Sequence, residues 1–376
     1  MLKKKLSIIY VIGDSSLTGA PRHLLALTDN IDQKEFSISV ILPQGPLADK
    51  LQAKNIKTFL VPMRYRSDVP AVNAMKKLLK KYDPDILHAH GSRGGLLARL
   101  AVRNLPIKVV YTEHLLTKNF RLDNPLLYWT HIRSMRVLDR WTDITIAVSK
   151  AVGEFLVQSK ITKPDKVKVI YNGVDLVPDK VSEDQLDNLR KQYKIDKEEI
   201  VIGTVGSLNL QKDTSCLIKA LPKIFTKLPN AKLLIVGSGP LQHRLQKLSK
   251  KLKIEKKVIF TGSIENVSPL LKLMNIFVLP SRSEAFGLSV LEAMRMGIPV
   301  VATKVGGLSE VIVNNRNGIF VPAGDPKKLT SAIMKILNDR KLIKKLISGG
   351  WDTLPKFAMS KMVNETEKLY KSLFKK

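Results

Sequence analysis

Short apolar runs alternate with longer stretches of mixed apolar and polar residues along almost the whole chain. Short apolar runs bounded by turn residues are typical of buried strands, and the stretches between them carry helical spacing. The pattern predicts two successive series of strands. These are Leu6–Ile12, Ser37–Leu42, Ile86–Ala89, Lys108–Thr112, Ile144–Val148 and Val167–Ile170, and then Ile200–Val205, Lys232–Val236, Val258–Thr261, Ile276–Leu279 and Pro299–Ala302.

The alternation of strands and helices favours parallel sheets, and its two series favour two doubly wound α/β domains. A chain of 376 residues is also long for a single core. The first series ends near Asn172–Pro178, and a polar helix over residues 182–194 follows. We therefore expect an N-terminal Rossmann-like domain at 1–176 and a C-terminal one at 177–357.

The N-terminal stretch MLKKKLSIIYVIGD superficially resembles a signal peptide. Its apolar run is interrupted by Ser7, and no small-residue cleavage site follows it. A first strand of an α/β domain is the better interpretation. No apolar run approaches the roughly 20 residues that a membrane-spanning helix needs, so we expect a protein that is soluble or lies on a membrane surface.

The stretch Ser281–Thr303, SRSEAFGLSVLEAMRMGIPVVAT, combines two carboxylates with a glycine and a helix. Glu284 precedes Gly287, and a helix expected over about Gly287–Met296 carries Glu292. The unpaired N–H groups of a first helical turn attract phosphate, and glycine lets an anion approach the backbone closely. Flanking carboxylates are compatible with phosphate if each accepts hydrogen bonds from sugar hydroxyls.

The distance between the two carboxylates indicates the size of the ligand. Half a dozen helical residues span about 9 Å, which suits a sugar at each end of a diphosphate. The stretch therefore indicates a nucleotide-sugar site. An ordinary amphipathic helix with solvated glutamates is the alternative.

The motif Glu-Ala-Phe-Gly-Leu at 284–288, followed by Glu-Ala-Met at 292–294, resembles the Glu-x7-Glu signature of glycosyltransferase family 4. These are retaining enzymes with the GT-B fold, in which two doubly wound Rossmann-like domains face a central cleft. The resemblance implies transfer of a sugar, of the hexosyltransferase type, from a nucleotide diphosphate to a hydroxyl. It also implies that the last helix, 358–376, packs back on the first domain.

In the second domain the resemblance continues after the first strand. Gly206, Leu208 and Lys212 match the family pattern, but Ser207 stands where the family usually has an arginine. Since that arginine and the lysine normally share the charge of the diphosphate, one of two cations is missing, and either Lys212 carries more of the charge or another basic residue substitutes. The resemblance implies that Lys212 and helix N-termini hold the diphosphate without a metal.

In the first domain, the resemblance covers the ends of three strands. Gly19 opens a helix that can bind an anion, although Thr18 and Pro21 depart from the family pattern. The His-Gly-Ser-Arg turn at 90–93 resembles the family turn that borders the acceptor, and the Thr-Glu-His turn at 112–114 resembles the one that contacts the transferred sugar. Arg22 is either an acceptor contact or a surface arginine.

The resemblance therefore implies three groups of site residues. The catalytic residues are Glu284, His114 and Lys212, with Glu284 on sugar hydroxyls and His114 near the anomeric carbon. The donor-binding residues are Gly19, Gly206, Lys212, Gly237, Gly262, Ile264, Glu284, Phe286, Gly287, Leu288 and Glu292, the last on the ribose. The acceptor-side residues are Arg22, His90 and Arg93.

Two patterns could suggest a metal, and we expect none. Asp83-Pro84-Asp85 imitates a metal-binding Asp-x-Asp motif, but it precedes a strand and more plausibly ends a helix. His88 and His90 alternate on one face of a strand at a spacing that can suit zinc. No cysteine or carboxylate near them in the sequence completes a site, although folding could supply one.

The net charge of +30, from 63 Lys and Arg against 33 Asp and Glu, calls for an anionic partner. The segment Phe120–Trp141 interleaves arginines with aromatic and leucine residues, as a helix at a lipid interface does. The alternative is a helix that covers the sheet with its Leu, Met and Trp buried. The one cysteine, Cys216, fits a reducing compartment, so we expect a cytoplasmic protein with possible contact to the inner face of the membrane.

We therefore expect a nucleotide-sugar donor, with UDP favoured over GDP, and a lipid-linked or cell-envelope glycan as the acceptor. One alternative is a nucleotide-sugar epimerase of the same fold, against which the Glu-Ala-Phe-Gly-Leu motif argues. Another is a nucleic-acid-binding protein, suggested by the charge. The lysines of this chain are spread over many helices and form no recognition module, so we expect no specific nucleic acid as a partner.

Overall fold

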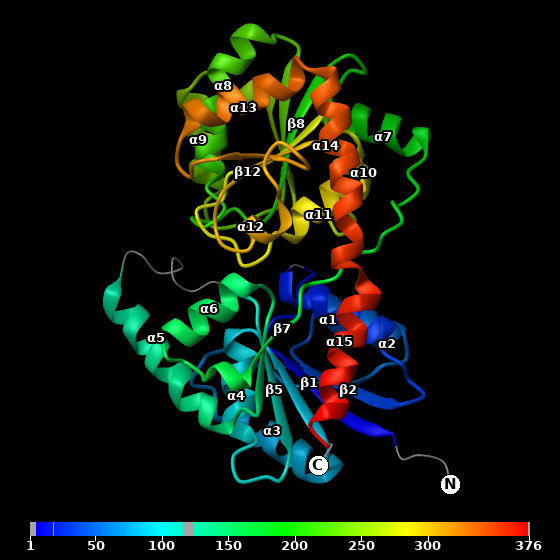
Figure 1. The fold of residues 1–376 in the computed structure, drawn as a ribbon, viewed down its shortest axis with the longest axis vertical. Coiled ribbons are helices and arrows are strands. Elements are labelled where there is room, and N and C mark those ends of the chain that lie inside the picture. The colour runs from blue at the N-terminus through cyan, green and yellow to red at the C-terminus, as the bar shows by residue number, and fades with distance from the viewer. Residues whose placement is uncertain (1–4, 18, 116–123, 375–376) are drawn as a thin grey trace. The chain divides into compact units, whose positions relative to one another are not determined.

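The structure of the protein is a computed structural model that describes residues 5–17, 19–115 and 124–374 (Figure 1). The chain divides into two compact units, each built on one sheet. Unit 1 comprises residues 1–173 and 359–376, and unit 2 comprises residues 174–358. The sequence analysis sets these two breaks after residues 176 and 357.

Unit 1 is a seven-stranded parallel sheet in the order β3-β2-β1-β4-β5-β6-β7. Its strands are β1 Leu6–Ile12, β2 Phe36–Leu42, β3 Lys57–Leu60, β4 Ile86–His90, β5 Lys108–Glu113, β6 Ile144–Ala147 and β7 Val167–Val169. Its α-helices are α1 Gly19–Asn30, α2 Pro46–Ala53, α3 Val69–Tyr82, α4 Ser92–Ala101, α5 Pro125–Leu138, α6 Lys150–Gln158 and α15 Met359–Ser372. The strand order reverses between β1 and β4, so ligands are expected beside the carboxyl ends of these strands.

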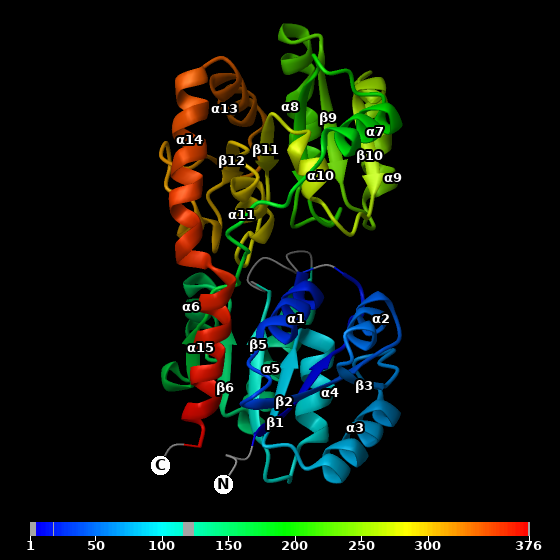
Figure 2. The same ribbon diagram turned by 90° about the vertical axis from the view of Figure 1, so that its right-hand side faces the viewer.

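Both faces of this sheet are covered, which explains why its strands are almost continuously apolar. Ile8, Tyr10 and Ile12 of β1 point to one face, where they share a core with apolar residues of α1, α2 and α15. Figure 2 shows the red helix α15 beside α1, although the two are far apart in the sequence. The predicted return of the last helix is therefore seen within unit 1.

Unit 2 is a six-stranded parallel sheet in the order β10-β9-β8-β11-β12-β13. Its strands are β8 Ile200–Val205, β9 Ala231–Val236, β10 Val258–Gly262, β11 Ile276–Leu279, β12 Val300–Thr303 and β13 Ile319–Val321. Its α-helices are α7 Glu183–Tyr193, α8 Thr214–Lys227, α9 Gln242–Lys251, α10 Ser268–Lys272, α11 Leu288–Arg295, α12 Leu308–Val311, α13 Pro326–Leu337 and α14 Arg340–Thr353. Here the strand order reverses between β8 and β11.

The first residues of unit 2 are held by a buried arginine that the sequence analysis did not single out. Arg295, near the end of α11, donates to the carboxylate of Asp179 at 2.8 Å and to the carbonyl oxygen of Val177 at 3.4 Å. Its side chain is only 8% exposed. A single arginine thus fixes the start of unit 2 to the helix that carries Glu292.

The predicted strands are found within a residue or so of their expected ends, and two strands were missed. Both β3 and β13 lie at the edge of a sheet and are short. No residue of β3 is fully buried, so its sequence lacks the apolar run of a central strand, and β13 is apolar but only three residues long. Among the described helices, none is long and apolar enough to cross a membrane.

Candidate functional site

The carboxyl edge of the unit 2 sheet brings Lys212 and Glu284 together across the reversal of strand order. Lys212 lies in the loop after β8 and Glu284 in the loop after β11. The Lys212 ammonium donates to Glu284 Oε2 at 2.5 Å, and the Ser281 hydroxyl lies 3.3 Å from the same oxygen. The two charged side chains are 22% and 13% exposed. An ammonium has three N–H donors, so this bond leaves Lys212 able to bind a further acceptor.

The two loops are also joined through their backbones and a second ion pair. The Arg282 N–H donates to the carbonyl oxygen of Gln211 at 2.7 Å, and Arg282 Nε donates to Asp213 Oδ2 at 2.7 Å. The Lys212 N–H donates to Asn209 Oδ1 at 3.1 Å. These bonds fix Lys212 relative to Glu284 before any ligand binds.

Arg282 is a basic residue of this edge that the sequence analysis missed. Its side chain is 57% exposed, and it is held next to Lys212 by the bond to Asp213. The signal was its position two residues before Glu284. Ser207 stands where the family usually has an arginine. Arg282 is therefore the candidate for the second cation, beside Lys212, that would bind the diphosphate.

Helix α11 begins directly after Gly287, at the point where the sequence predicted an anion-binding helix start. Gly287 has φ +98°, and a Cβ atom there would lie 2.4 Å from Leu308 Cδ2. The backbone conformation therefore requires glycine, and a larger residue would also have to displace the Leu308 side chain. Leu288 is the first helical residue, and Glu292, one turn further on, is buried. Phe286 is buried against Phe357, with ring centroids 5.3 Å apart.

Three of the predicted donor-binding glycines lie side by side at the ends of β8, β9 and β10. The Gly206 N–H donates to the carbonyl oxygen of Val236 at 3.0 Å, and the Gly237 N–H donates to that of Gly262 at 2.8 Å. Ile264 follows β10 and is 36% exposed. The predicted residues of unit 2 thus gather along one edge of its sheet, where backbone groups can approach a ligand.

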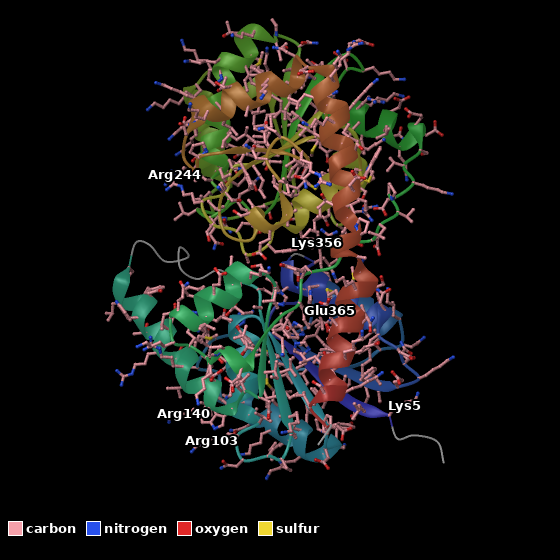
Figure 3. All side chains as sticks on the ribbon, viewed as in Figure 1. Lys5, Arg103, Arg140, Arg244, Lys356 and Glu365 are labelled. Atoms are coloured by element: carbon pink, nitrogen blue, oxygen red, sulfur yellow. The ribbon has the colours of Figure 1, made fainter. Side chains whose placement is uncertain are left out.

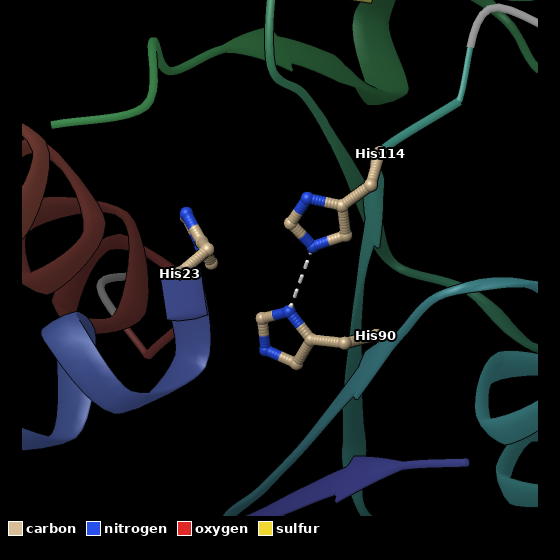
Figure 4. A group of neighbouring side chains, drawn as sticks. All are labelled: His23, His90 and His114. Atoms are coloured by element: carbon tan, nitrogen blue, oxygen red, sulfur yellow. Dashed lines mark hydrogen bonds between the residues drawn. The ribbon is translucent and has the colours of Figure 1, made fainter. Parts of the chain in front are cut away.

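In unit 1, three histidines converge where the strand order reverses (Figure 4). His90 ends β4, His114 follows β5, and His23 lies on α1. His90 Nδ1 and His114 Nε2 are 3.2 Å apart. The ring of His23 meets that of His114 edge-on, with centroids 4.8 Å apart. One ring nitrogen from each histidine lies within 4.8 Å of one from each of the others.

Burial keeps these histidines neutral at pH 7. It lowers the pKa of His23 to about 4, and it lowers the pKa values of His90 and His114 well below their usual range. The neighbouring imidazoles add to the effect for His90 and His114. Each ring therefore offers one N–H donor and one nitrogen lone pair.

The turn that carries His114 is held by a buried carboxyl group. Glu113 Oε2 accepts from the Tyr111 hydroxyl at 3.0 Å, and Oε1 accepts from the Leu115 N–H at 3.0 Å. Burial raises the pKa of Glu113. The residue preceding His114 thus fixes the direction in which the histidine leaves the sheet.

The remaining predicted residues of unit 1 lie around the same edge. Gly19 is the first, exposed residue of α1, and Arg22 is half-buried. Arg93 donates to the carbonyl oxygen of Gly13, and to that of Arg64 at 3.4 Å. Its bonds to Gly13 join α4 to the end of β1. Thr18 lies outside the described residues.

The residues discounted as metal ligands have structural partners. His88 lies between the Tyr370 hydroxyl, 2.5 Å from Nδ1, and the Thr112 hydroxyl, 2.7 Å from Nε2. Asp83 caps the end of α3, and Asp85 accepts from the Ser7 N–H at 2.8 Å. The partners that folding supplies for His90 are His23 and His114, which the sequence analysis did not connect with it.

Two family models together match most of the chain. The model described as "Glycosyltransferase Family 4" matches residues 17–177, and the one described as "Glycosyl transferases group 1" matches residues 185–351. The first match lies almost wholly in unit 1 and the second lies in unit 2.

Curated relatives include proteins from archaea and bacteria. An uncharacterized glycosyltransferase of Methanocaldococcus jannaschii is 35% identical over 231 residues, which cover 60% of this chain and 59% of that protein. The UDP-Gal:alpha-D-GlcNAc-diphosphoundecaprenol alpha-1,3-galactosyltransferase of Escherichia coli is 27% identical over 356 residues. That match covers 90% of this chain and 89% of the relative.

Solved structures share the fold over nearly the full length. Anabaena HepE in complex with UDP and glucose has a TM-score of 0.87 and 21% identity, covering 98% of this chain and 100% of that one. A glycosyltransferase from Rickettsia africae has a TM-score of 0.82 and 22% identity, covering 99% and 100%. At these identities the likeness is one of fold.

Proposed function

The chain belongs to glycosyltransferase family 4 and is a glycosyltransferase of the GT-B fold, and from this premise we propose that it transfers a hexose from a UDP-sugar to a hydroxyl group with retention of anomeric configuration. The observation that carries the proposal is the Lys212–Glu284 pair, held at the start of α11 beside a row of glycines. The name of the E. coli relative specifies UDP-galactose, and the Anabaena structure contains UDP and glucose. Both favour UDP as the carrier.

The diphosphate of the donor is held by charge and backbone dipoles. Lys212 and the first turn of α11 supply positive potential, and Arg282 contributes the cation that Ser207 does not. A diphosphate leaving group gains negative charge as the glycosidic bond breaks. These groups stabilise that charge without a metal ion.

The carboxylates and His114 orient the two sugars. Glu284 accepts hydrogen bonds from hydroxyls of the transferred sugar and also accepts one from the Lys212 ammonium. Glu292 accepts hydrogen bonds from the ribose hydroxyls. His114 donates to the transferred sugar near the anomeric carbon. The departing phosphate takes the proton of the acceptor hydroxyl on the same face of the sugar, which retains the configuration.

Replacement of Glu292 tests the donor site. Glu292→Ala removes a charged acceptor from the ribose hydroxyls, and hydrogen bonds to charged groups contribute about 1.5–3 kcal/mol. We expect calorimetry to show UDP binding weakened about tenfold or more. Glu255→Ala is the matched control, because Glu255 is exposed and precedes β10, at the opposite edge of the sheet.

Two results would contradict the proposal. Unchanged UDP affinity in Glu292→Ala would show that Glu292 does not contact the ribose. Incubation of the protein with UDP-sugars and candidate acceptors tests the reaction itself, and a changed sugar configuration without glycoside formation would indicate an epimerase.

We propose that the acceptor is lipid-linked and that the enzyme works at an anionic membrane face in the cytoplasm. The name of the E. coli relative describes a diphosphoundecaprenol-linked acceptor. Helix α5 presents exposed Leu126 and Trp129 together with exposed Arg133 and Arg136. Apolar and basic side chains on one exposed helix are the combination that anionic lipid surfaces bind.

A further inference from the structure

Three of the buried side-chain atoms that have no hydrogen-bond partner among the described residues are found around one site in unit 1. They are His23 Nδ1, His90 Nε2 and Asn172 Oδ1. The rings of His23 and His90 have centroids 5.6 Å apart, and Asn172 interacts with His23. His90 faces His114 with its other ring nitrogen, Nδ1, so the three rings and Asn172 form one cluster.

The geometry of the histidines suits a small tetrahedral cation. Zinc binds imidazole nitrogen at about 2.0–2.1 Å, so two tetrahedral ligands lie about 3.3 Å apart. His90 Nδ1 and His114 Nε2 are already 3.2 Å apart. The nitrogens of all three rings lie within 4.8 Å, so a shift of roughly 1.5 Å completes the set.

We propose that His23, His90 and His114 form a binding site for a zinc-type divalent cation in unit 1. Figure 4 shows the three side chains grouped together, His23 from α1 and His90 and His114 from the ends of β4 and β5. His23 is 8% exposed and His90 is fully buried, so both are held by packing. His114 is partly exposed, which gives an ion access to the cluster.

The chemistry of the ligands defines which cations the site takes. Three neutral imidazoles suit Zn²⁺, Co²⁺, Ni²⁺ and Cu²⁺, whereas Mg²⁺ and Ca²⁺ prefer oxygen ligands. A metal needs a deprotonated ring nitrogen, and each neutral imidazole has one. The amide oxygen of Asn172 can accept the N–H of His23 and orient its ring, as residues behind metal-bound histidines commonly do.

Three protein ligands leave a fourth coordination position open for water or another small ligand. His88 does not supply this position, because both of its nitrogens are bonded to hydroxyl groups. One consequence rests on the proposed function: a metal bound to His114 Nε2 prevents that nitrogen from donating to the transferred sugar. Zn²⁺ should therefore inhibit transfer, and EDTA should not reduce it.

The test is metal binding by the full chain after treatment with EDTA and dialysis. Calorimetric titration with Zn²⁺ should saturate at one ion per chain, and Co²⁺ should develop the intense visible absorption of tetrahedral coordination. His23→Ala and His114→Ala should each weaken binding by about tenfold or more. His243→Ala is the control, because His243 is an exposed histidine of α9 in unit 2, and it should bind as the wild type does.

Circular dichroism checks that each variant is folded. His23 is buried and its variant can lose structure, so the partly exposed His114 provides the second, independent variant. Absence of saturable Zn²⁺ and Co²⁺ binding by the wild type would overturn the proposal, as would binding lost only in His243→Ala. Zn²⁺ binding by a protein that shows no transfer even in its EDTA-treated, metal-free form would uphold the metal site and refute the proposed function.

Discussion

Individual side chains at the unit 2 edge show how opposite charges are arranged for one ligand. Lys212 and Glu284 are 2.5 Å apart, so each stabilises the other in a partly buried position. A cation for phosphate and an anion for hydroxyl groups can therefore lie side by side. This arrangement suits a ligand whose sugar is joined directly to a phosphate.

We expect Lys212→Met to weaken the binding of UDP but not of uridine. The ammonium contributes a charged hydrogen bond of about 1.5–3 kcal/mol to the diphosphate, equivalent to about tenfold or more in affinity. Its loss also leaves the charge of Glu284 uncompensated beside the phosphates. Calorimetry with both ligands measures the difference, and Lys223→Met, which removes an exposed lysine of α8, is the control.

The same titrations are carried out with EDTA present. We expect EDTA to leave the UDP affinity and the transfer rate of the wild type unreduced, because side chains and a helix start hold the diphosphate. An absolute requirement for Mg²⁺ or Mn²⁺ would show that the proposed charge balance is incomplete. If Lys212→Met lost as much affinity for uridine as for UDP, the lysine would contact the nucleoside and not the diphosphate.

At the scale of elements, close contact between α4 and β1 sets the position of the unit 1 site. A Cβ atom at Gly94 would lie 2.4 Å from the Gly13 nitrogen and 2.9 Å from the Ile12 carbonyl carbon. The helix therefore lies directly against the end of β1, beside His90. No side chain larger than hydrogen fits unless the backbone moves.

We expect Gly94→Ala to destabilise unit 1, since overpacking a tight contact costs about 1–3 kcal/mol and here the contacted atoms are backbone. Gly153→Ala on α6 is the matched control: it is also buried and helical, but its nearest neighbours lie at 3.4–3.6 Å. Alanine there gains helix propensity of roughly 0.8–1 kcal/mol. Thermal unfolding followed by circular dichroism should show a lower midpoint for Gly94→Ala only, and equal midpoints for the two variants would contradict the packing argument.

At the scale of the whole molecule, the net charge of +30 acts together with the exposed face of one helix. The sequence analysis left two interpretations of the segment Phe120–Trp141 open, and residues 120–123 lie outside the described part of the chain. In the described part, Ile132 and Met135 are buried, whereas Leu126 is 72% and Trp129 is 61% exposed. The helix thus covers the sheet with one face and presents apolar residues on another.

We expect the protein to bind anionic vesicles in a salt-dependent way. Each basic residue near such a surface contributes about 1 kcal/mol, so replacing Arg133, Arg136 and Arg140 by serine should weaken binding about a hundredfold. Figure 3 shows Arg140 directed outward from unit 1, and Arg244 directed outward from unit 2. Replacing Arg244, Lys247 and Lys250 of α9 by serine removes the same charge elsewhere and is the control.

Vesicle co-sedimentation measures this effect. Binding should need anionic lipid, decrease with added salt and decrease far more in the α5 variant than in the α9 variant. Equal recovery with neutral and anionic vesicles would contradict the proposed membrane contact, as would no recovery with either. An equal decrease of vesicle binding in both variants would show that binding depends on the total charge of the protein and not on α5.

The sequence by itself determined the parallel α/β architecture, the central strands and the family. A buried parallel strand must be apolar along its length, so periodicity reveals it. The resemblance to the family also assigned Gly206, Lys212 and Glu284 to one donor site, and in the structure Lys212 and Glu284 meet at the carboxyl edge of the unit 2 sheet. These features depend on local sequence or on a general rule of topology.

Only the tertiary structure decided the partners of particular side chains. His88 and His90 occupy one face of one strand, yet His88 is bonded to Tyr370 and Thr112 while His90 meets His23 and His114. Arg282 and Arg295 likewise have partners that are distant in the sequence. Such contacts depend on which elements pack on each face and on separations of a few ångströms, and hydrophobic periodicity carries no information about either.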